Sequence, residues 1–166
     1  MPDLLVPGLW SPIEGSCFVV PAKPAGQPRA RVGVIGGHAR AFKSSVARRL
    51  EADVLAFAAP AAPPAPWQGP VEVFVEARCD VPLSWPKRKR QAALAGLVRP
   101  TGRPDADNIA KLILDALNRS GRYWRDDAQV VELRARKVYA AVPETVVVVR
   151  AARVLSRAPQ EAGHAK

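Results

Sequence analysis

The stretch DNIAKLILDALNR, residues 107–119, decides the fold, because its apolar residues recur at the spacing of an amphipathic helix. The apolar stripe of this helix consists of Ile109, Leu112, Ile113, Ala116 and Leu117. A stripe of this kind must be buried against another layer of secondary structure. Residues 130–138 and 145–149 follow it and are rich in valine, which is typical of β-strands. We therefore expect this helix to pack on a β-sheet.

The chain before this helix supplies the remaining strands. Residues 71–79 alternate between small apolar and larger side chains and form the clearest strand of the sequence. Residues 17–20 are a short apolar run of strand length. Residues 28–35 alternate in part and precede Gly36 and Gly37, which predicts a hairpin turn.

A second helix is expected from Lys43 onward, with Ser44 or Ser45 as its N-cap. Its apolar residues at helical spacing are Val46, Leu50, Val54 and Ala58. The proline-rich segment 60–66 ends this helix and forms a stiff surface connector.

The interleaved helices and strands predict an α/β (α+β) fold. We expect a single small domain, with a mixed β-sheet packed against helices. Residues 1–15 read as a loose N-terminal leader, residues 16–153 as the domain, and residues 154–166 as a polar, alanine-rich tail. The length of 166 residues fits one domain.

The chain is strongly basic. It carries 25 Lys and Arg against 15 Asp and Glu, a formal net charge of +10 with a pI near 10.4. Such an excess favours a polyanionic partner, nucleic acid before an anionic membrane or an acidic protein. No signal peptide is recognisable, and no apolar run approaches the ~18–20 residues that span a bilayer, so we expect a cytoplasmic protein without a membrane partner. The two cysteines predict free thiols in a reducing compartment.

The densest group of chemically active residues is RPDADNIAK, residues 103–111. Asp107 is placed to cap the helix, and Asp105 precedes it by two residues. Asp107, Lys111 and Asp115 follow at intervals of four, which predicts one polar face opposite the apolar stripe. The same residues also fit a purely structural interpretation, a helix cap followed by an ion pair.

A second acidic group, Asp126 and Asp127, lies in the connection between the helix and the next strand. Carboxylates gathered at one place repel one another unless a cation compensates. Mg²⁺ prefers oxygen ligands and needs only a few carboxylates, waters and a substrate phosphate, which Asp105, Asp107 and Asp127 suit. Lys111 is placed to stabilise charge that develops on a scissile phosphate. An acidic turn without a metal is the alternative interpretation of the doublet.

The run RPDADNIAKLILDALNRSGRYWRDDAQ, residues 103–129, followed by Val130, Val131, Glu132 and Lys137, resembles the core signature of the RusA-like Holliday junction resolvases. That signature is a DxDNxxK helix, an aliphatic stripe, then a glycine, an aromatic residue and a DDxQV turn. The segments PRARV from Pro28, GGH at 36–38 and 82–86 match phage-type members in order. The resemblance extends from about Phe18 to Val149. The leader before Cys17 and the segment 56–66 depart from the family pattern but do not touch the motif.

The resemblance implies a RusA-like fold and a structure-selective endodeoxyribonuclease that resolves four-way junctions in DNA recombination and repair. It implies Mg²⁺ as cofactor, with Mn²⁺ possible and no small-molecule cofactor, and a homodimer as the working form. It assigns Asp105, Asp107 and Asp127 as metal-binding carboxylates and Lys111 as the catalytic lysine. Asp126, which matches the neighbouring acidic position, is a further candidate metal ligand. The alternatives are a non-catalytic basic DNA-binding protein and a metal-dependent nuclease acting on flaps or forks.

Several basic residues are candidates for contacts to DNA phosphates. They are Arg29, Arg31, Lys87, Arg88, Lys89, Arg90, Arg103 and Lys137. A solvated helix start or an ordinary edge-strand cation explains the same residues equally well. Trp85 and Trp124 suit stacking on unpaired bases, although a place in the core is the more frequent role of such residues. His38 and His164 are poor metal ligands by context.

Overall fold

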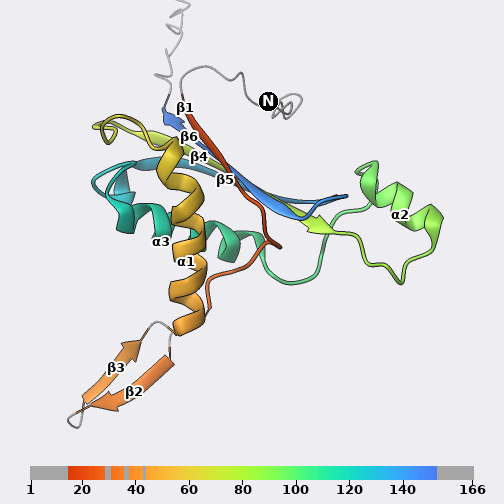
Figure 1. Ribbon diagram of the computed structural model, residues 1–166, viewed down its shortest axis with the longest axis horizontal. Helices are drawn as coiled ribbons and strands as arrows, with labels where there is room; N and C mark the ends of the chain where they lie inside the picture. The colour runs from red at the N-terminus through yellow and green to blue at the C-terminus, as the bar shows by residue number, and fades with distance from the viewer. Residues whose placement is uncertain (1–14, 29–30, 36–37, 43, 153–166) are drawn as a thin grey trace, which may run out of the picture.

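The central sheet of the protein has four strands, β1 (Gly15–Val20), β4 (Val71–Asp80), β5 (Val130–Ala140) and β6 (Glu144–Ala151). Their order in the sheet is β1-β6-β4-β5 (Figure 1). β4 pairs parallel with β5 and antiparallel with β6, which in turn pairs antiparallel with β1. The sheet is therefore mixed, as predicted from the hairpin signals and the interleaved elements. The computed structural model describes residues 15–28, 31–35, 38–42 and 44–152.

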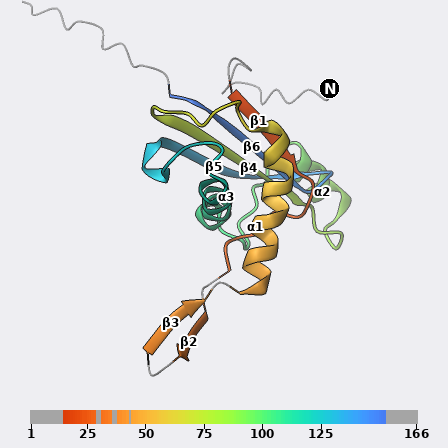
Figure 2. The same ribbon diagram turned by 60° about the vertical axis from the view of Figure 1, so that its left-hand side comes forward.

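Two helices, α1 (Ser45–Ala58) and α3 (Ala106–Ser120), pack against each other and cover one face of this sheet (Figures 1 and 2). The predicted stripe of α3 is buried at every position, and Ala110 joins it. Its side chains meet inward-facing residues of the sheet, among them Phe18, Val73, Val75 and Val147. The single small α+β domain expected from the sequence is confirmed.

The predicted apolar face of α1 is only partly correct. Val54 and Ala58 are buried, but Val46 is 59% exposed. Ala47 and Glu51 occupy the buried face in its place. In the first half of α1 the buried positions therefore lie one residue after the predicted ones. The carboxylate of Glu51 can be buried there because it has polar partners, which are described below. The predicted cap is confirmed at Ser44, whose hydroxyl accepts from the amide of Ala47 at 3.1 Å.

The other face of the sheet carries ion pairs instead of helices. Arg150 donates to Glu72 at 2.7 Å. Glu76 accepts from Arg78 at 2.8 Å and from Arg136 at 2.6 Å. These pairs explain why both glutamates of β4 are buried although the alternation of the strand places them opposite the core.

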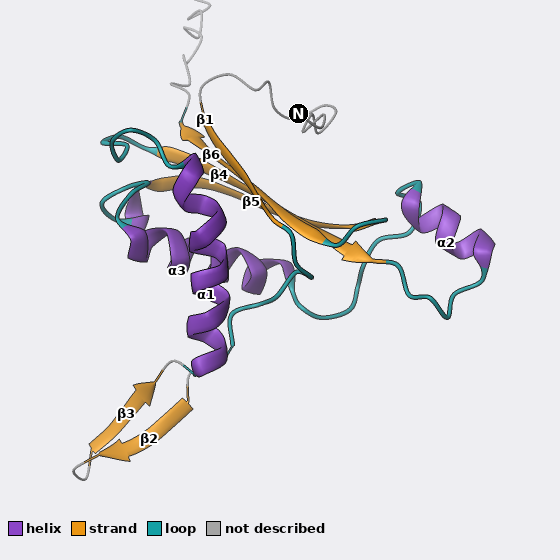
Figure 3. Ribbon diagram, in the orientation of Figure 1, coloured by secondary structure: helices purple, strands orange, loops and turns teal. Residues whose placement is uncertain are grey.

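Two elements project from this body. β2 (Arg31–Ile35) and β3 (His38–Phe42) form an antiparallel hairpin beyond the N-terminal end of α1 (Figure 3). The pairing of Ile35 with His38 confirms the predicted hairpin, whose glycines at 36 and 37 lie outside the described residues. The helix α2 (Lys87–Leu94) projects on the other side, beyond the C-terminal end of β4.

Short 3₁₀ helices complete the described chain: η1 (Ala59–Ala61) ends α1 before the proline-rich connector, and η2 (Asp127–Gln129) precedes β5. Over the described ranges, none of the helices is both long and apolar enough to cross a membrane. The predicted leader, apart from Gly15 in β1, and the predicted tail lie outside the described residues.

Candidate active site at the N-terminal end of α3

The N-terminal end of α3 presents two of the predicted aspartates. Asp105 is the N-cap residue, with extended φ and ψ of −74° and 150°, and its carbonyl accepts the amide of Ile109 at 3.1 Å. Asp107 lies in the first turn of the helix. The prediction that Asp107 caps the helix was therefore wrong, because the first helical hydrogen bond already starts at Asp105.

Both carboxylates are available for a ligand. Asp105 and Asp107 are exposed, and the side chain of Asp105 makes no capping hydrogen bond. The positive end of the helix dipole favours anionic groups at this position and offsets part of their mutual repulsion. Two acidic side chains that serve no evident structural purpose here are suited to a cation.

Lys111 lies one turn after Asp107 and is exposed, as expected for a shared polar face. Asp115 departs from the prediction. It is half-buried, and its carboxylate accepts from the side-chain amide of Gln27 at 2.7 Å. Asp115 therefore belongs to the contact between α3 and the preceding chain, and the exposed functional face is shorter than the sequence suggested.

That preceding chain, residues 24–28, is held firmly against α3. The amide of Gln27 donates to the carbonyl of Asn108 at 3.0 Å. A Cβ atom at Gly26 would lie 2.6 Å from Nδ2 of Asn108, so a larger residue at this position would require the Asn108 side chain to move. An open cleft thus lies beside the end of α3. Residues 24–28 line one side of it, and Arg103 and Asp105 line the other.

A polar network behind this wall was missed from the sequence. The side-chain amide of Gln27 also donates to the fully buried Glu51 of α1 at 3.1 Å. Glu51 forms an ion pair with Arg119 near the end of α3. The network joins α1, α3 and residues 24–28, and no spacing in the sequence connects positions so far apart.

Lys137 of β5 also reaches this end of α3. Its ammonium donates to the carbonyl of Gly102 at 2.7 Å and to that of Pro104 at 3.0 Å. The Arg103–Pro104 peptide bond between these carbonyls is cis. Lys137 therefore faces the site, and it holds the loop that carries Arg103 and Asp105.

The acidic doublet forms a separate structure. Asp126 caps η2 by accepting from the amide of Ala128 at 2.8 Å, and Gln129 returns its side chain to the amides of Arg125 and Asp126. Gln129 also donates to the carbonyls of Trp67 and Gly69, each at 2.9 Å. One oxygen of Asp126 is thus used structurally, whereas Asp127 is exposed in the first turn of η2.

The two acidic groups lie at opposite ends of α3. The helix has 15 residues, which at ~1.5 Å per residue is about 22 Å. Asp105 precedes it, and Asp127 follows its other end. β5 gives the same estimate, because Lys137 contacts the loop before α3 and lies seven residues, or about 23 Å, along the strand from Val130. The three aspartates predicted to share a metal are not neighbours within one chain.

The fit of a metal ion follows from this arrangement. Within the described part of the chain, no three acidic, histidine or cysteine side chains gather as one ligand set. Asp105 and Asp107 nevertheless meet the usual demand of Mg²⁺, which binds one or two carboxylates, several waters and substrate phosphate. One chain therefore offers a two-carboxylate site, and Asp127 does not join it.

The basic residues of α2 are accessible. Lys87, Arg88, Lys89 and Arg90 are all exposed. The ammonium of Lys89 lies 3.7 Å from the ring centroid of Trp85, and this ring packs edge-on against Tyr139 of β5 at 5.4 Å. Trp85 therefore anchors α2 to the sheet.

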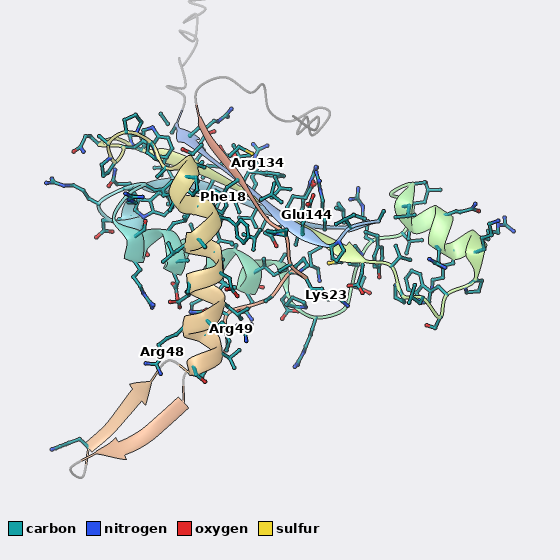
Figure 4. All side chains as sticks on the ribbon, in the orientation of Figure 1. Phe18, Lys23, Arg48, Arg49, Arg134 and Glu144 are labelled. Carbon is teal, nitrogen blue, oxygen red and sulfur yellow. The ribbon has the colours of Figure 1, made fainter. Side chains whose placement is uncertain are left out.

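Trp124 is fully buried and donates to Asn118 at 3.2 Å, which confirms a place in the core. Arg103 is exposed beside Asp105. Two exposed arginines that the sequence analysis passed over, Arg48 and Arg49, extend from the first turns of α1 near the hairpin (Figure 4). The adjacent pair in the sequence was their only signal. Arg29 lies outside the described residues, and of Arg31 only the backbone is described.

Comparison with known proteins covers most of the chain. Residues 21–150 match the family model described as Endodeoxyribonuclease RusA. The chain is also 33% identical over 135 residues to an uncharacterised protein, YqaN, of Bacillus subtilis (strain 168). This alignment covers 80% of the chain and 94% of the relative.

Proposed function

Because the chain belongs to the RusA endodeoxyribonuclease family, we propose that it is a Mg²⁺-dependent endonuclease that resolves four-way DNA junctions in recombination and repair. The observation that carries the proposal is the end of α3, where Asp105 at the N-cap and Asp107 in the first turn are exposed and Lys111, also exposed, lies one turn beyond Asp107. An acidic pair beside a cation suits a phosphodiester that is held by metal and approached by water.

Each residue has a separate task in this proposal. Asp105 and Asp107 would hold the Mg²⁺ ion, which when bound lowers the pKa of an attacking water and neutralises charge on the phosphate. Lys111 stabilises the charge that grows on the phosphate oxygens in the transition state. Lys137 keeps the 102–104 loop in place and so positions Asp105.

The net charge of +10 and the projecting basic helix support a DNA substrate. Lys87, Arg88, Lys89 and Arg90 extend beyond the C-terminal end of β4, and Arg103 stands next to the acidic pair. Phosphate contacts at such separated points would position a branched substrate over the site. Arg31, which begins β2, and the pair Arg48 and Arg49 extend the same proposal to the hairpin side, and Arg29 is proposed as a DNA contact from the sequence alone.

We infer a homodimer as the active form. A four-way junction has approximate two-fold symmetry, so two equivalent sites suit paired nicks. The separation of Asp127 from Asp105 and Asp107 supports the same conclusion, because a second copy is the simplest source of an Asp127 close to the pair. In this arrangement each site uses the end of α3 from one chain and the η2 turn from the other.

Co-expression of two inactive variants tests the shared site. Asp107→Asn and Asp127→Asn should each be inactive, whereas their heterodimer should regain one intact site and nick one strand of a junction. If Asp127 acts within its own chain, the heterodimer contains no intact site and stays inactive. An active Asp127→Asn homodimer would remove Asp127 from the catalytic set.

The activity itself is tested on a synthetic four-way junction beside duplex, flap, fork and single-strand controls, with Mg²⁺, with Mn²⁺ and with EDTA. We expect symmetric paired cuts in the junction that require the metal. Binding without cleavage would favour a non-catalytic DNA-binding protein, and faster cutting of flaps or forks would favour the other nuclease alternative.

A further inference from the structure

The projecting part of the chain around α2, residues 81–100, is basic and carries exposed leucines (Figure 1). We call this segment the α2 lobe. It contains five basic residues and no Asp or Glu. Three of the four exposed leucines among the described residues belong to it: Leu83, Leu94 and Leu97, which are 84%, 51% and 81% exposed. The lobe therefore suits a partner that offers both negative charge and apolar surface.

Helix α2 packs on the body of the protein through a small side chain. Ala93 is fully buried, whereas its neighbour Leu94 is exposed. Trp85, just before the helix, packs edge-on against Tyr139 of β5 with 5.4 Å between the ring centroids. An ordinary surface helix turns its largest apolar residues toward the core. In α2 this arrangement is reversed, so its leucine is available to a partner.

The end of α2 holds Leu97 in a defined position. The amide of Leu97 donates to the carbonyl of Ala92 at 2.9 Å, and the amide of Gly96 donates to that of Ala93 at 3.0 Å. With Gly96 at a φ of 78°, these two bonds form a Schellman motif. The residue in the place of Leu97 commonly contacts an apolar residue in the last turns of its own helix. Here those positions hold only Gln91 and Ala92, and Leu97 stays exposed.

The lobe stands beside the candidate active site. Tyr139 of β5 holds Trp85 at the base of the lobe. Lys137, two residues earlier on the same strand, holds the loop before Asp105. Two residues of strand are about 7 Å. DNA bound near Asp105 is therefore within reach of the lobe. An anionic membrane also matches the charge of the lobe, but it would approach the exposed Asp105 and Asp107, which repel it.

We propose that Leu94 and Leu97 contact unstacked bases at the centre of a branched DNA, while the basic residues of the lobe hold its phosphates. The proposal rests on the DNA substrate of the proposed function and names the part of that substrate which the lobe recognises. Leucine is one of the apolar residues that act as wedges between base steps. Unstacking costs least where pairing is already disturbed, as it is at a branch point. The lobe thereby distinguishes a branch from a continuous duplex.

Binding across a salt series, with EDTA present, separates the apolar contacts from the phosphate contacts. Apolar contacts release no counterions, so Leu94→Ala combined with Leu97→Ala should leave the salt slope unchanged. Junction affinity should fall by roughly 10- to 100-fold at every salt concentration, because two leucines lose an apolar contact. Affinity for continuous duplex should hardly change. An unchanged junction affinity, or an equal loss for junction and duplex, would overturn the proposal.

The matched control is Phe57→Ala, which removes an apolar side chain 42% exposed in the last turn of α1, outside the lobe. It should leave both affinities unchanged. A loss of junction affinity equal to that of the double alanine variant would mean that any exposed apolar residue has this effect, which would also overturn the proposal.

A fluorescent base analogue reports the wedge directly. Stacking quenches 2-aminopurine, so its fluorescence at the branch point should rise when saturating wild type binds in EDTA. The rise should be largely absent with the double alanine variant at saturation. Leu97→Phe keeps an apolar wedge and should retain the rise. Equal fluorescence with wild type and the double alanine variant would refute contact of these leucines with unstacked bases.

Other partners predict other results for the double alanine variant. Dissociation of a wild-type dimer into monomers in sedimentation would assign the leucines to a second copy. Loss of binding to phosphatidylserine vesicles with unchanged junction affinity would assign them to a membrane. Either result overturns the proposal. A wild type that shows the leucine-dependent fluorescence rise but cuts no junction with Mg²⁺ would retain the role of the lobe and remove the proposed activity.

Discussion

The basic helix α2 offers the most quantitative prediction. Replacing Lys87, Arg88, Lys89 and Arg90 together by alanine removes four exposed positive charges from one projecting helix. Alanine is the strongest helix former, so α2 should be retained. Trp85 still packs on Tyr139 and keeps the helix attached to the sheet. The variant should therefore change DNA affinity without changing the fold.

The size of the effect follows from counterion release. Each phosphate contact contributes about 0.9 to the slope of log K against log salt, so four contacts contribute about 3.6. The ammonium of Lys89 already lies over the ring of Trp85. If Lys89 therefore makes no phosphate contact, the other three residues contribute about 2.7 to the slope. Between 50 and 200 mM salt, the wild type should lose roughly 40- to 150-fold more affinity than the variant.

The assay is the dissociation constant for a four-way junction across a salt series, with EDTA present to prevent cleavage. Lys87→Arg combined with Lys89→Arg is the matched control, because it keeps both charges and should keep the slope. The saturated single-turnover rate of the alanine variant should stay close to that of the wild type. An unchanged salt slope would refute the assignment of α2 to the DNA path.

Three further predictions concern the site and its support. Lys111→Ala should leave junction affinity within a few-fold and lower the single-turnover cleavage rate by roughly 10²-fold or more, because the lost cation acts on transition-state charge. Glu51→Gln should lower the free energy of unfolding in urea by about 1.5–3 kcal/mol, the range for a hydrogen bond to a charged group. Burial raises the pKa of Tyr123, whose hydroxyl donates to the carbonyl of Ala58, to about 12 from its ordinary 10.0. Because the pKa of Tyr123 is higher in the folded state than in the unfolded state, the protonated phenol stabilises the folded protein. This contribution to the free energy of unfolding is complete below pH 10 and is lost as the pH rises through 12. The stability difference between wild type and Tyr123→Phe, measured in urea, should therefore shrink above pH 10.

Each of these has a contrary outcome. A Lys111→Ala protein that binds weakly but cuts normally when saturated would make Lys111 a phosphate anchor. An unchanged urea midpoint for Glu51→Gln would mean that the buried network does not stabilise the contact of α1 with α3. A stability difference for Tyr123→Phe that is constant up to pH 12 would contradict the retention of the phenol proton in the folded state.

The elements that the sequence predicted correctly are those with a strong local pattern. The stripe of α3 has six buried positions at helical spacing, and the valine-rich strands leave few alternatives. The α1 face was misplaced because Glu51 is buried through partners on other elements, Gln27 and Arg119. Local hydrophobicity carries no information on such pairs.

In the candidate site, too, local patterns were predicted correctly and contacts between distant parts of the chain were not. Asp105, Asp107 and Lys111 lie within seven residues, and the helix alone brings them together. The position of Asp127 depends on β5 pairing parallel with β4, which makes the strand run back along α3 and leaves η2 at the far end. Strand order is set by packing of the whole domain, so the separation of the acidic groups was visible only in the structure.

The most direct test of the central claim is single-turnover cleavage of a four-way junction by Asp107→Asn at saturating enzyme, with junction binding measured beside it. The substitution keeps the size of the exposed side chain and removes one of the two carboxylates at the end of α3. We predict Mg²⁺-dependent paired cleavage by the wild type, and in the variant a loss of several orders of magnitude with binding retained. Near-normal cleavage by Asp107→Asn, or full wild-type cleavage in EDTA, would contradict a metal-dependent nuclease site at this position.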